Sequence, residues 1–422
     1  MVNSHFKWLR LISVAILLGF LVLGFRPASA GEYLPELLGS GQSLRAAQVD
    51  AVALRARSSS LNLGLLEVAS DQLEKAEVPA PIAITLFEDT RLVARFHQLN
   101  RHENGFTLSG SIDGGAYAEI HLSMVGDAFF ASLNTHKGVF IIRSSGDQSA
   151  EVIQIDSSRI PDEVKPVAIP TAEDLEQPES VSVPLVGATT TDDGSRIDVF
   201  VGYTDDARVA AGGISYIQAM INTGIAETNG GYSYSLVNQR VNLVGTAEYA
   251  YDESSFNWST TLSRWAGTSD GYMDSVHATR DSLKADEVVL IVNNTAYCGI
   301  GYQMGSSNIS TTFAPYAFAL VSRVCLTGYY SLAHEMGHNM GAAHDRYTGG
   351  DGAYSYSHGY WIETTPDYYP YRTIMAYDVP YTYGYDSTRV NRWSNPNVLY
   401  AGYPTGKPTT DPESAYNALT LN

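Results

Sequence analysis

The sequence contains the stretch His334-Glu335-Met336-Gly337-His338-Asn339-Met340-Gly341-Ala342-Ala343-His344-Asp345. Residues four apart on a helix lie on one face, so His334 and His338 can present two imidazole nitrogens to a single metal ion. Glu335 follows the first histidine, where its carboxylate can take a proton from a water molecule on that ion. Gly341 allows the chain to leave the helix in a sharp turn, which brings His344 round as a third ligand.

This ligand set predicts a catalytic zinc ion. Three neutral imidazoles leave one tetrahedral position open for water or substrate, whereas structural zinc sites are closed. The HExxH pattern alone would arise by chance in about one in a hundred such chains, and adding Gly341 and His344 lowers this to roughly a few in a hundred thousand. We therefore expect one zinc ion bound by His334, His338 and His344.

Other candidate ligands form no recognisable pattern. His277 and His358 are isolated in the sequence, and a lone histidine is more often a structural residue than a ligand. Several aspartates in the C-terminal region could together favour calcium, but they match no defined calcium-binding loop. These aspartates are Asp345, Asp351, Asp367, Asp378 and Asp386. Calcium therefore stays an unsupported option.

Residues 334–344 resemble the HExxHxxGxxH signature of the metzincin metallopeptidases. Downstream, Thr373-Ile374-Met375-Ala376-Tyr377 is similar to the Met-turn of that group. Asp345, directly after the third histidine, is similar to the residue at this position in the reprolysin and adamalysin branch. Tyr377, two residues after the methionine, is more similar to the residue found in astacins and serralysins. Two further segments are similar to bacterial reprolysin-like peptidases, including the peptidyl-Asp metallopeptidases: Cys298-Gly299-Ile300-Gly301-Tyr302 and Arg392-Trp393-Ser394-Asn395-Pro396.

The resemblance implies a zinc-dependent endopeptidase acting on proteins or peptides. Its expected fold is an α/β (α+β) catalytic domain with a twisted mixed sheet, an active-site helix and an irregular lower subdomain. Glu335 is expected to be the general base, and Met375 to lie beneath the zinc. Tyr377 is expected either to donate a hydrogen bond to the transition state or to be one more packing tyrosine of a Tyr-rich region.

The hydrophobic pattern of the second half supports a layered α/β sheet, because apolar strand-like runs alternate with helical periodicity. The run at 287–292 is apolar throughout, as a central strand requires. Strands are expected at 197–203, 241–247, 287–292 and 314–321, and helices near 214–228 and 272–283. After His344 the chain is rich in Gly, Tyr and Pro and has little periodicity.

The first half has a different composition. Of the 28 tyrosines, only Tyr33 and Tyr117 precede residue 190. Short alternating segments such as 106–112 and 139–143 predict antiparallel strands, and His97, His102, His121 and His136 are expected at the surface or in strands. A proline-rich acidic stretch from 161 to 184 predicts an extended linker where processing can occur. We expect a signal peptide at 1–30, a β-rich prodomain at 31–165, a linker at 166–190 and the catalytic domain at 191–422.

The N-terminus predicts export. Lys7 and Arg10 precede an apolar run at 11–25, and the small-residue site Ala28-Ser29-Ala30 follows. The alternative interpretation is a membrane anchor, but the apolar run is shorter than the roughly 20 residues of a spanning helix. The mature chain is therefore expected outside the cytoplasm, extracellular or periplasmic, and away from the membrane. Its net charge of −19 opposes nucleic-acid binding, which depends on cationic side chains.

Cys298 and Cys325 are the only cysteines. In an exported protein a lone pair predicts one disulfide, with two buried thiols as the alternative. No cysteine lies between 31 and 190, so a prodomain cannot silence the zinc through a thiolate. Inhibition of a precursor would have to come from steric cover or from a carboxylate or imidazole.

Two other functions compete with peptide hydrolysis. A secreted zinc-binding or peptide-binding protein could keep a peptidase fold without turnover, although the presence of Glu335 and all three histidines argues against it. A zinc amidase acting on non-peptide substrates would need the same site. Neither the cleavage preference nor the oligomeric state is encoded in these motifs.

Overall fold

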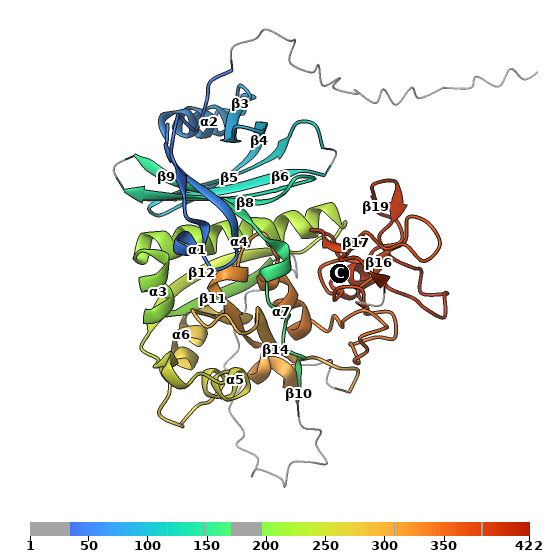
Figure 1. Ribbon diagram of the computed structural model, residues 1–422. Coiled ribbons are helices and arrows are strands. Elements are labelled where there is room, and N and C mark those ends of the chain that lie inside the picture. The colour runs from blue at the N-terminus through green and yellow to red at the C-terminus, as the bar shows by residue number, and fades with distance from the viewer. Residues whose placement is uncertain are drawn as a thin grey trace, which may run out of the picture. The chain divides into compact units, whose positions relative to one another are not determined.

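A six-stranded mixed sheet is the framework of the C-terminal half in this computed structural model (Figure 1). Four neighbouring strands run parallel to one another, and the remaining two strands run in the opposite direction. Both faces are covered, which explains the continuously apolar strands. In spatial order the strands are β10 (Val167–Ala168), β14 (Gly299–Gln303), β15 (Phe318–Ser322), β13 (Glu287–Val292), β11 (Arg196–Thr204) and β12 (Arg240–Tyr249).

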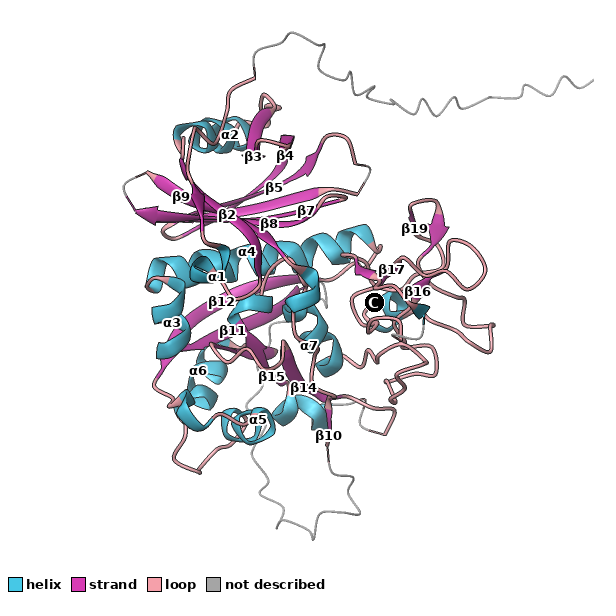
Figure 2. Cartoon of the chain, viewed as in Figure 1, coloured by secondary structure: helices cyan, strands magenta, loops and turns pink. Residues whose placement is uncertain are grey.

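Helices cover the two faces of this sheet (Figure 2). One face packs against a core that includes side chains of α4 and α7, and the other against a core that includes α5 and α6. The helices are α3 (Asp205–Ala211), α4 (Ile214–Tyr234), α5 (Trp258–Trp265), α6 (Ser275–Leu283) and α7 (Ser331–Asn339). The expected mixed α/β architecture is confirmed.

A nine-stranded antiparallel sheet forms most of the N-terminal half, in the order β1-β2-β9-β8-β7-β6-β5-β4-β3. Its alternating residues build a second core against α2 (Gly64–Glu74), while α1 (Ala46–Val49) is short. The strands are β1 (Ser43–Leu44), β2 (Ala53–Ser60), β3 (Ile82–Phe87), β4 (Thr90–His102), β5 (Gly105–Ile112), β6 (Glu119–Val125), β7 (Ala128–Thr135), β8 (Gly138–Gly146) and β9 (Ser149–Ile155).

The two halves share a hydrophobic core. Phe130 and Ile141 of the N-terminal sheet belong to the same buried cluster as Ile217 and Ile221 of α4. Residues Pro35–Asn422 accordingly form one compact unit. The structure describes residues 34–422 except 116, 147, 170–195, 308, 310 and 381–382, so the expected signal peptide and most of the expected linker lie outside the described residues.

Several predicted elements need correction. The predicted helix ended near residue 228, but α4 continues to Tyr234 through Gly230 and Gly231. Packing explains the glycine at 231, since a Cβ there would lie 2.3 Å from the side chain of Asn391. Residues 314–316 belong to the 3-10 helix η3 (Thr311–Tyr316), whose Pro315 cannot join a central strand, so β15 begins only at Phe318. Strand β14 and helix α5 were not predicted.

The proline-rich stretch is also not a free linker at its start. Val167 and Ala168 form β10, which pairs in parallel with Tyr302 and Gln303 of β14. Glu163 is buried, with a relative exposure of 4%. His121 lies in β6, as expected of a strand histidine; it is buried, and its ring nitrogen Nδ1 lies 2.9 Å from Ser109 Oγ.

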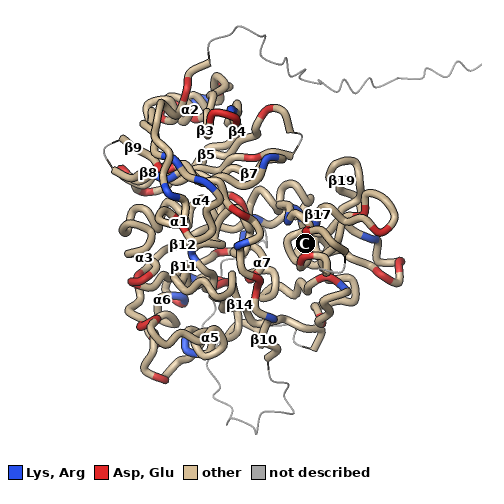
Figure 3. Tube along the Cα trace, in the orientation of Figure 1, with Lys and Arg blue, Asp and Glu red and all other residues tan. Residues whose placement is uncertain are grey.

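The C-terminal region is irregular, as expected. It contains two-residue strands joined by long loops: β16 (Trp361–Ile362), β17 (Tyr371–Arg372), β18 (Thr388–Arg389), β19 (Leu399–Tyr400) and β20 (Tyr403–Pro404), followed by α8 (Asn417–Thr420). Acidic and basic residues are interspersed along the described chain (Figure 3). Within the described part of the chain, none of the helices combines the length and apolar character of a membrane span.

Cys298 and Cys325 form the predicted disulfide. It joins the residue before β14 to the 3-10 helix η4 (Arg323–Cys325), six residues before the helix that carries the histidines. We expect the double variant Cys298→Ser, Cys325→Ser to lose about 3 kcal/mol of unfolding free energy, because the bond closes a loop of 27 residues. Denaturant unfolding measures this loss, and reduced wild-type protein serves as the control. Equal stability of the oxidised wild type and the variant would contradict it.

Candidate metal centre and active site

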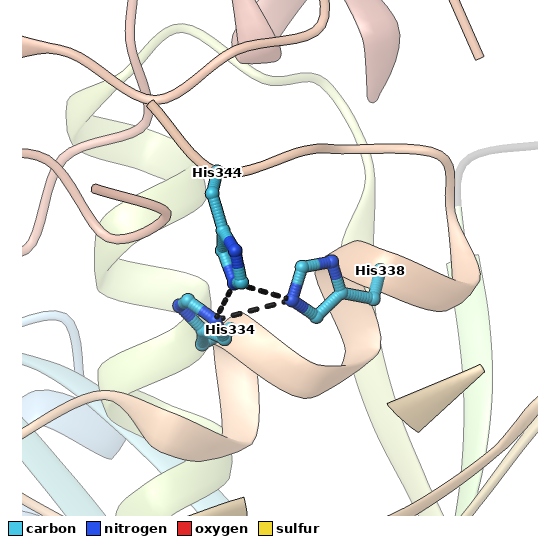
Figure 4. Close-up of side chains that lie close together, drawn as sticks. All are labelled: His334, His338 and His344. Carbon is cyan, nitrogen blue, oxygen red and sulfur yellow. Dashed lines mark hydrogen bonds between the residues drawn. The ribbon is translucent and has the colours of Figure 1, made fainter. Parts of the chain in front are cut away.

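Three histidines converge on one point (Figure 4). His334 and His338 lie one turn apart on α7, and His344 comes from the loop that begins at Gly341, whose φ of +89° is the left-handed turn expected of this glycine. Their Nε2 atoms lie 3.2 Å (His334 to His338), 3.2 Å (His334 to His344) and 3.0 Å (His338 to His344) apart. In a tetrahedral site with Zn–N bonds of about 2.0–2.1 Å, two ligand nitrogens lie roughly 3.3 Å apart. The observed Nε2 separations are close to this value.

The hydrogen bonds of the histidines direct their Nε2 lone pairs inward. His334 Nδ1 donates to the carbonyl of Ile374 at 2.9 Å, and His338 Nδ1 donates to Gln303 Oε1 at 2.9 Å. Burial lowers the pKa of all three imidazoles, that of His338 to about 3, so they are neutral at physiological pH. Three unprotonated nitrogens facing one another cannot satisfy one another, and this donor set fits a zinc ion.

Glu335 lies beside His334 and Glu163, and both of its carboxylate oxygens are buried and receive no hydrogen bond from a donor among the described residues. Burial, followed by the neighbouring carboxylate of Glu163, raises the pKa of Glu335 well above its usual range. A divalent cation nearby would counteract this shift and favour the carboxylate. Gly299 of β14 makes room for the carboxylate, because a Cβ there would lie 2.5 Å from Glu335 Oε1.

Residues 373–377, which are expected to form a Met-turn, pack against α7 through Met375. Met375 is fully buried, and a Cβ on Gly337 would lie 3.0 Å from its sulfur. Tyr377 packs its ring against His344 with centroids 4.2 Å apart. Its hydroxyl donates to the carbonyl oxygen of Glu163 at 3.0 Å.

Sequence reasoning missed two residues at this centre, Glu163 and Arg389. Glu163, His334 and Glu335 place ligand atoms within 4.8 Å of one another, and Arg389 Nη1 forms an ion pair with Glu163 Oε1 at 2.8 Å. Glu163 stands in the proline-rich stretch and Arg389 in the irregular region, and no local pattern singles out either one. The only available signal was the expectation that steric cover, a carboxylate or an imidazole would take the place of a thiolate.

The remaining candidates have local partners. Asp345 accepts hydrogen bonds from the backbone of Thr348 and Tyr377, and so ties the third-ligand loop to the Met-turn. His358 Nδ1 donates to the carbonyl of His344 at 2.9 Å, and His277 Nε2 donates to the carbonyl of Gly267 at 2.9 Å. Among the described residues, two groups of potential ligands lie close enough to hold an ion. One consists of His334, His338 and His344, and the other of Glu163, His334 and Glu335.

The chain is similar to known metallopeptidases. Residues 193–394 match Metallo-peptidase family M12 (Reprolysin_5). The chain is 36% identical over 310 residues to the peptidyl-Asp metalloendopeptidase of Stenotrophomonas maltophilia (strain K279a), covering 72% of this chain and 69% of that protein. It is 34% identical over 286 residues to the peptidyl-Asp metalloendopeptidase of Xanthomonas campestris pv. campestris, covering 68% of this chain and 64% of that protein. A solved structure, metalloproteinase-II from Bacteroides fragilis, aligns with a TM-score of 0.40 and 9% identity over 63% of this chain and 81% of that chain.

Proposed function

This chain belongs to the reprolysin-like zinc metallopeptidases of family M12, and we propose that it is a secreted endopeptidase, made as a precursor, in which Glu335 acts as general base. The observation that carries the proposal is the position of the buried Glu335 carboxylate within 4.8 Å of a ring nitrogen of His334, with no donor to it among the described residues. A general base needs such a free acceptor within reach of the reacting water.

The mechanism assigns one role to each residue. His334, His338 and His344 would hold the zinc, which would polarise the substrate carbonyl and lower the pKa of a water molecule. Glu335 accepts the proton of that water as it attacks the carbonyl carbon, and then passes this proton to the departing amine. The Tyr377 hydroxyl, which donates to the backbone carbonyl of Glu163, would stabilise the developing oxyanion.

The names of the relatives suggest a substrate. Two relatives are called peptidyl-Asp metalloendopeptidases, so we propose that this chain cleaves peptide bonds next to aspartate. A peptidase and a non-peptide amidase are separated by first processing the chain with limited trypsin treatment and then incubating it with denatured proteins and with small amides. New peptide N-termini, found by mass spectrometry and missing with Glu335→Gln, support the peptidase. Turnover of small amides alone would replace it by the amidase.

We propose that residues 160–168 keep the precursor latent. Asp162 and Val164 exchange backbone hydrogen bonds with Cys298 and Gly299 at 2.9 Å each, and β10 continues this pairing along β14. The segment therefore occupies the sheet edge directly beside Glu335, where it would exclude a substrate strand. Cleavage in the linker would release it.

Zinc removal should lower the thermal midpoint of the protein. A ligand at a thousandfold excess over its Kd stabilises the folded state by about 4 kcal/mol, so dialysis against a chelator should destabilise the chain and one equivalent of zinc should restore it. Differential scanning calorimetry with metal analysis measures both. Addition of calcium alone is the control, and full recovery with calcium, or an unchanged midpoint after chelation, would contradict the zinc assignment.

A further inference from the structure

We propose that Arg389 determines the specificity of this site: its guanidinium binds the acidic side chain that lies next to the scissile bond, and Glu163 occupies that position in the full-length chain. The inference rests on the proposed peptidase function and names a residue that binds the acidic side chain of the substrate. In the precursor, the carboxylate of Glu163 therefore takes the place of the substrate's carboxylate.

The pocket around Glu163 is built to hold a carboxylate. Arg389 Nη1 and Ser331 Oγ each donate to Glu163 Oε1 at 2.8 Å. The guanidinium also lies 4.2 Å from the ring centroid of Tyr329 and donates to the Tyr329 carbonyl at 3.2 Å. The side chains of Arg389 and Glu163 are 3% and 0% exposed, so the ion pair is shielded from water.

The pocket adjoins the reacting centre. The Glu163 carboxylate lies within 4.8 Å of ligand atoms of both Glu335 and His334. The backbone of the same residue accepts a hydrogen bond from the Tyr377 hydroxyl, and its neighbours pair with residues 298 and 299. A peptide held in this way places one side chain in the Arg389 pocket while its backbone lies at the catalytic groups.

Burial of the arginine identifies the kind of ligand. In the part of the chain that the structure describes, Glu163 supplies the carboxylate that forms an ion pair with Arg389. The neighbouring Arg372 is equally buried, but its carboxylate partner is Asp378, 4.0 Å away. It also donates to the backbone carbonyls of Ser387 and Ala376 and to the Tyr329 hydroxyl. If the segment around Glu163 leaves, Arg389 loses its counter-charge, whereas Arg372 keeps its partners. A buried cation without a counter-charge is costly, so the emptied pocket favours another carboxylate.

The segment itself supplies a control residue. Asp162 is exposed and Glu163 is buried, as expected for successive side chains of an extended strand. Both residues are acidic, but only Glu163 enters the pocket. Arg389 lies within residues 193–394, which match the peptidase family, and Glu163 lies outside them. The pocket thus belongs to the peptidase part and its present occupant does not.

The first experiment compares two peptides that differ only in Asp or Asn beside the cleaved bond. The full-length chain is processed by limited trypsin treatment, which is followed by mass spectrometry. We expect kcat/KM to favour the Asp peptide by about a hundredfold, because a desolvated charge pair is lost with Asn. Arg389→Gln should reduce this ratio to about threefold or less, and Arg389→Lys should keep part of it, since lysine retains the charge without the planar fork.

Arg372→Gln is the matched control, because it removes a buried arginine beside the same tyrosine. It should leave the Asp-to-Asn ratio unchanged even if it lowers the thermal midpoint. An undiminished ratio in Arg389→Gln would overturn the inference. Equal cleavage of the two peptides by the wild type would do so as well.

A second measurement covers the case in which Arg389→Gln does not fold. Peptides with the sequence of residues 160–168 are tested as inhibitors of the wild-type enzyme. We expect Glu163→Gln in the peptide to weaken inhibition at least about tenfold and Asp162→Asn to have little effect. Equal inhibition by the Glu and Gln peptides would refute the role of the pocket. Absence of any cleavage that depends on Glu335 is a separate result, which would refute the proposed function itself.

Discussion

Glu335→Gln should lower kcat/KM for peptide hydrolysis at least about a thousandfold while the chain still binds one zinc ion. The amide has nearly the same shape as the carboxylate but cannot accept the proton of the attacking water, so the general-base contribution is lost. His334 and His338 keep their hydrogen bonds to Ile374 and Gln303, so zinc affinity should change little. Steady-state kinetics and elemental analysis of the same preparation measure the two quantities.

Incomplete processing must be separated from loss of catalysis in this variant. If the enzyme processes itself, as the proposed latency allows, an inactive variant would retain segment 160–168 and its site would stay covered. The variant is therefore processed with trypsin and compared with wild type treated in the same way. Activity within tenfold of wild type after identical processing would exclude Glu335 as the base, and loss of zinc would show that the substitution disturbs the metal centre instead.

Local patterns predicted the elements that depend on local physics. The apolar run at 287–292 became β13 with the same bounds, because a central strand buried on both faces needs continuous apolar residues. The histidine spacing placed two rings on one face of α7, because helical periodicity alone determines that geometry. The disulfide followed from the presence of only two cysteines.

Long-range contacts could not be predicted in this way. Glu163 and Arg389 are 226 residues apart, and their ion pair depends on how the proline-rich stretch lies along β14. Strand β14 itself has two glycines in five residues and no alternating pattern, because Gly299 and Gly301 are determined by the approach of Glu335 rather than by strand propensity. Residues shaped by a neighbour that is distant in sequence carry no local signature.

Tyr377→Phe should lower kcat about a hundredfold and leave KM and zinc content nearly unchanged. This is the usual size of the loss when one oxyanion donor is removed. The structure supports the role, because the hydroxyl donates to a peptide carbonyl, that of Glu163, beside the catalytic groups. Burial raises the pKa of this phenol, so it stays protonated and can donate at physiological pH.

The substitution separates the hydroxyl from the packing of the ring. Phenylalanine keeps the contact with His344, where the ring centroids lie 4.2 Å apart, so a purely structural tyrosine would tolerate the change. Tyr369→Phe is the matched control, since Tyr369 packs against Trp361 and Tyr383 in the same Tyr-rich region. The loss of the hydrogen bond to Glu163 should also loosen the segment over the site, so the Tyr377→Phe precursor should be processed by trypsin faster than wild type. An unaltered kcat in the fully processed variant would leave Tyr377 only its packing role. Its hydroxyl would then donate to Glu163 in the precursor and make no contribution to the reaction.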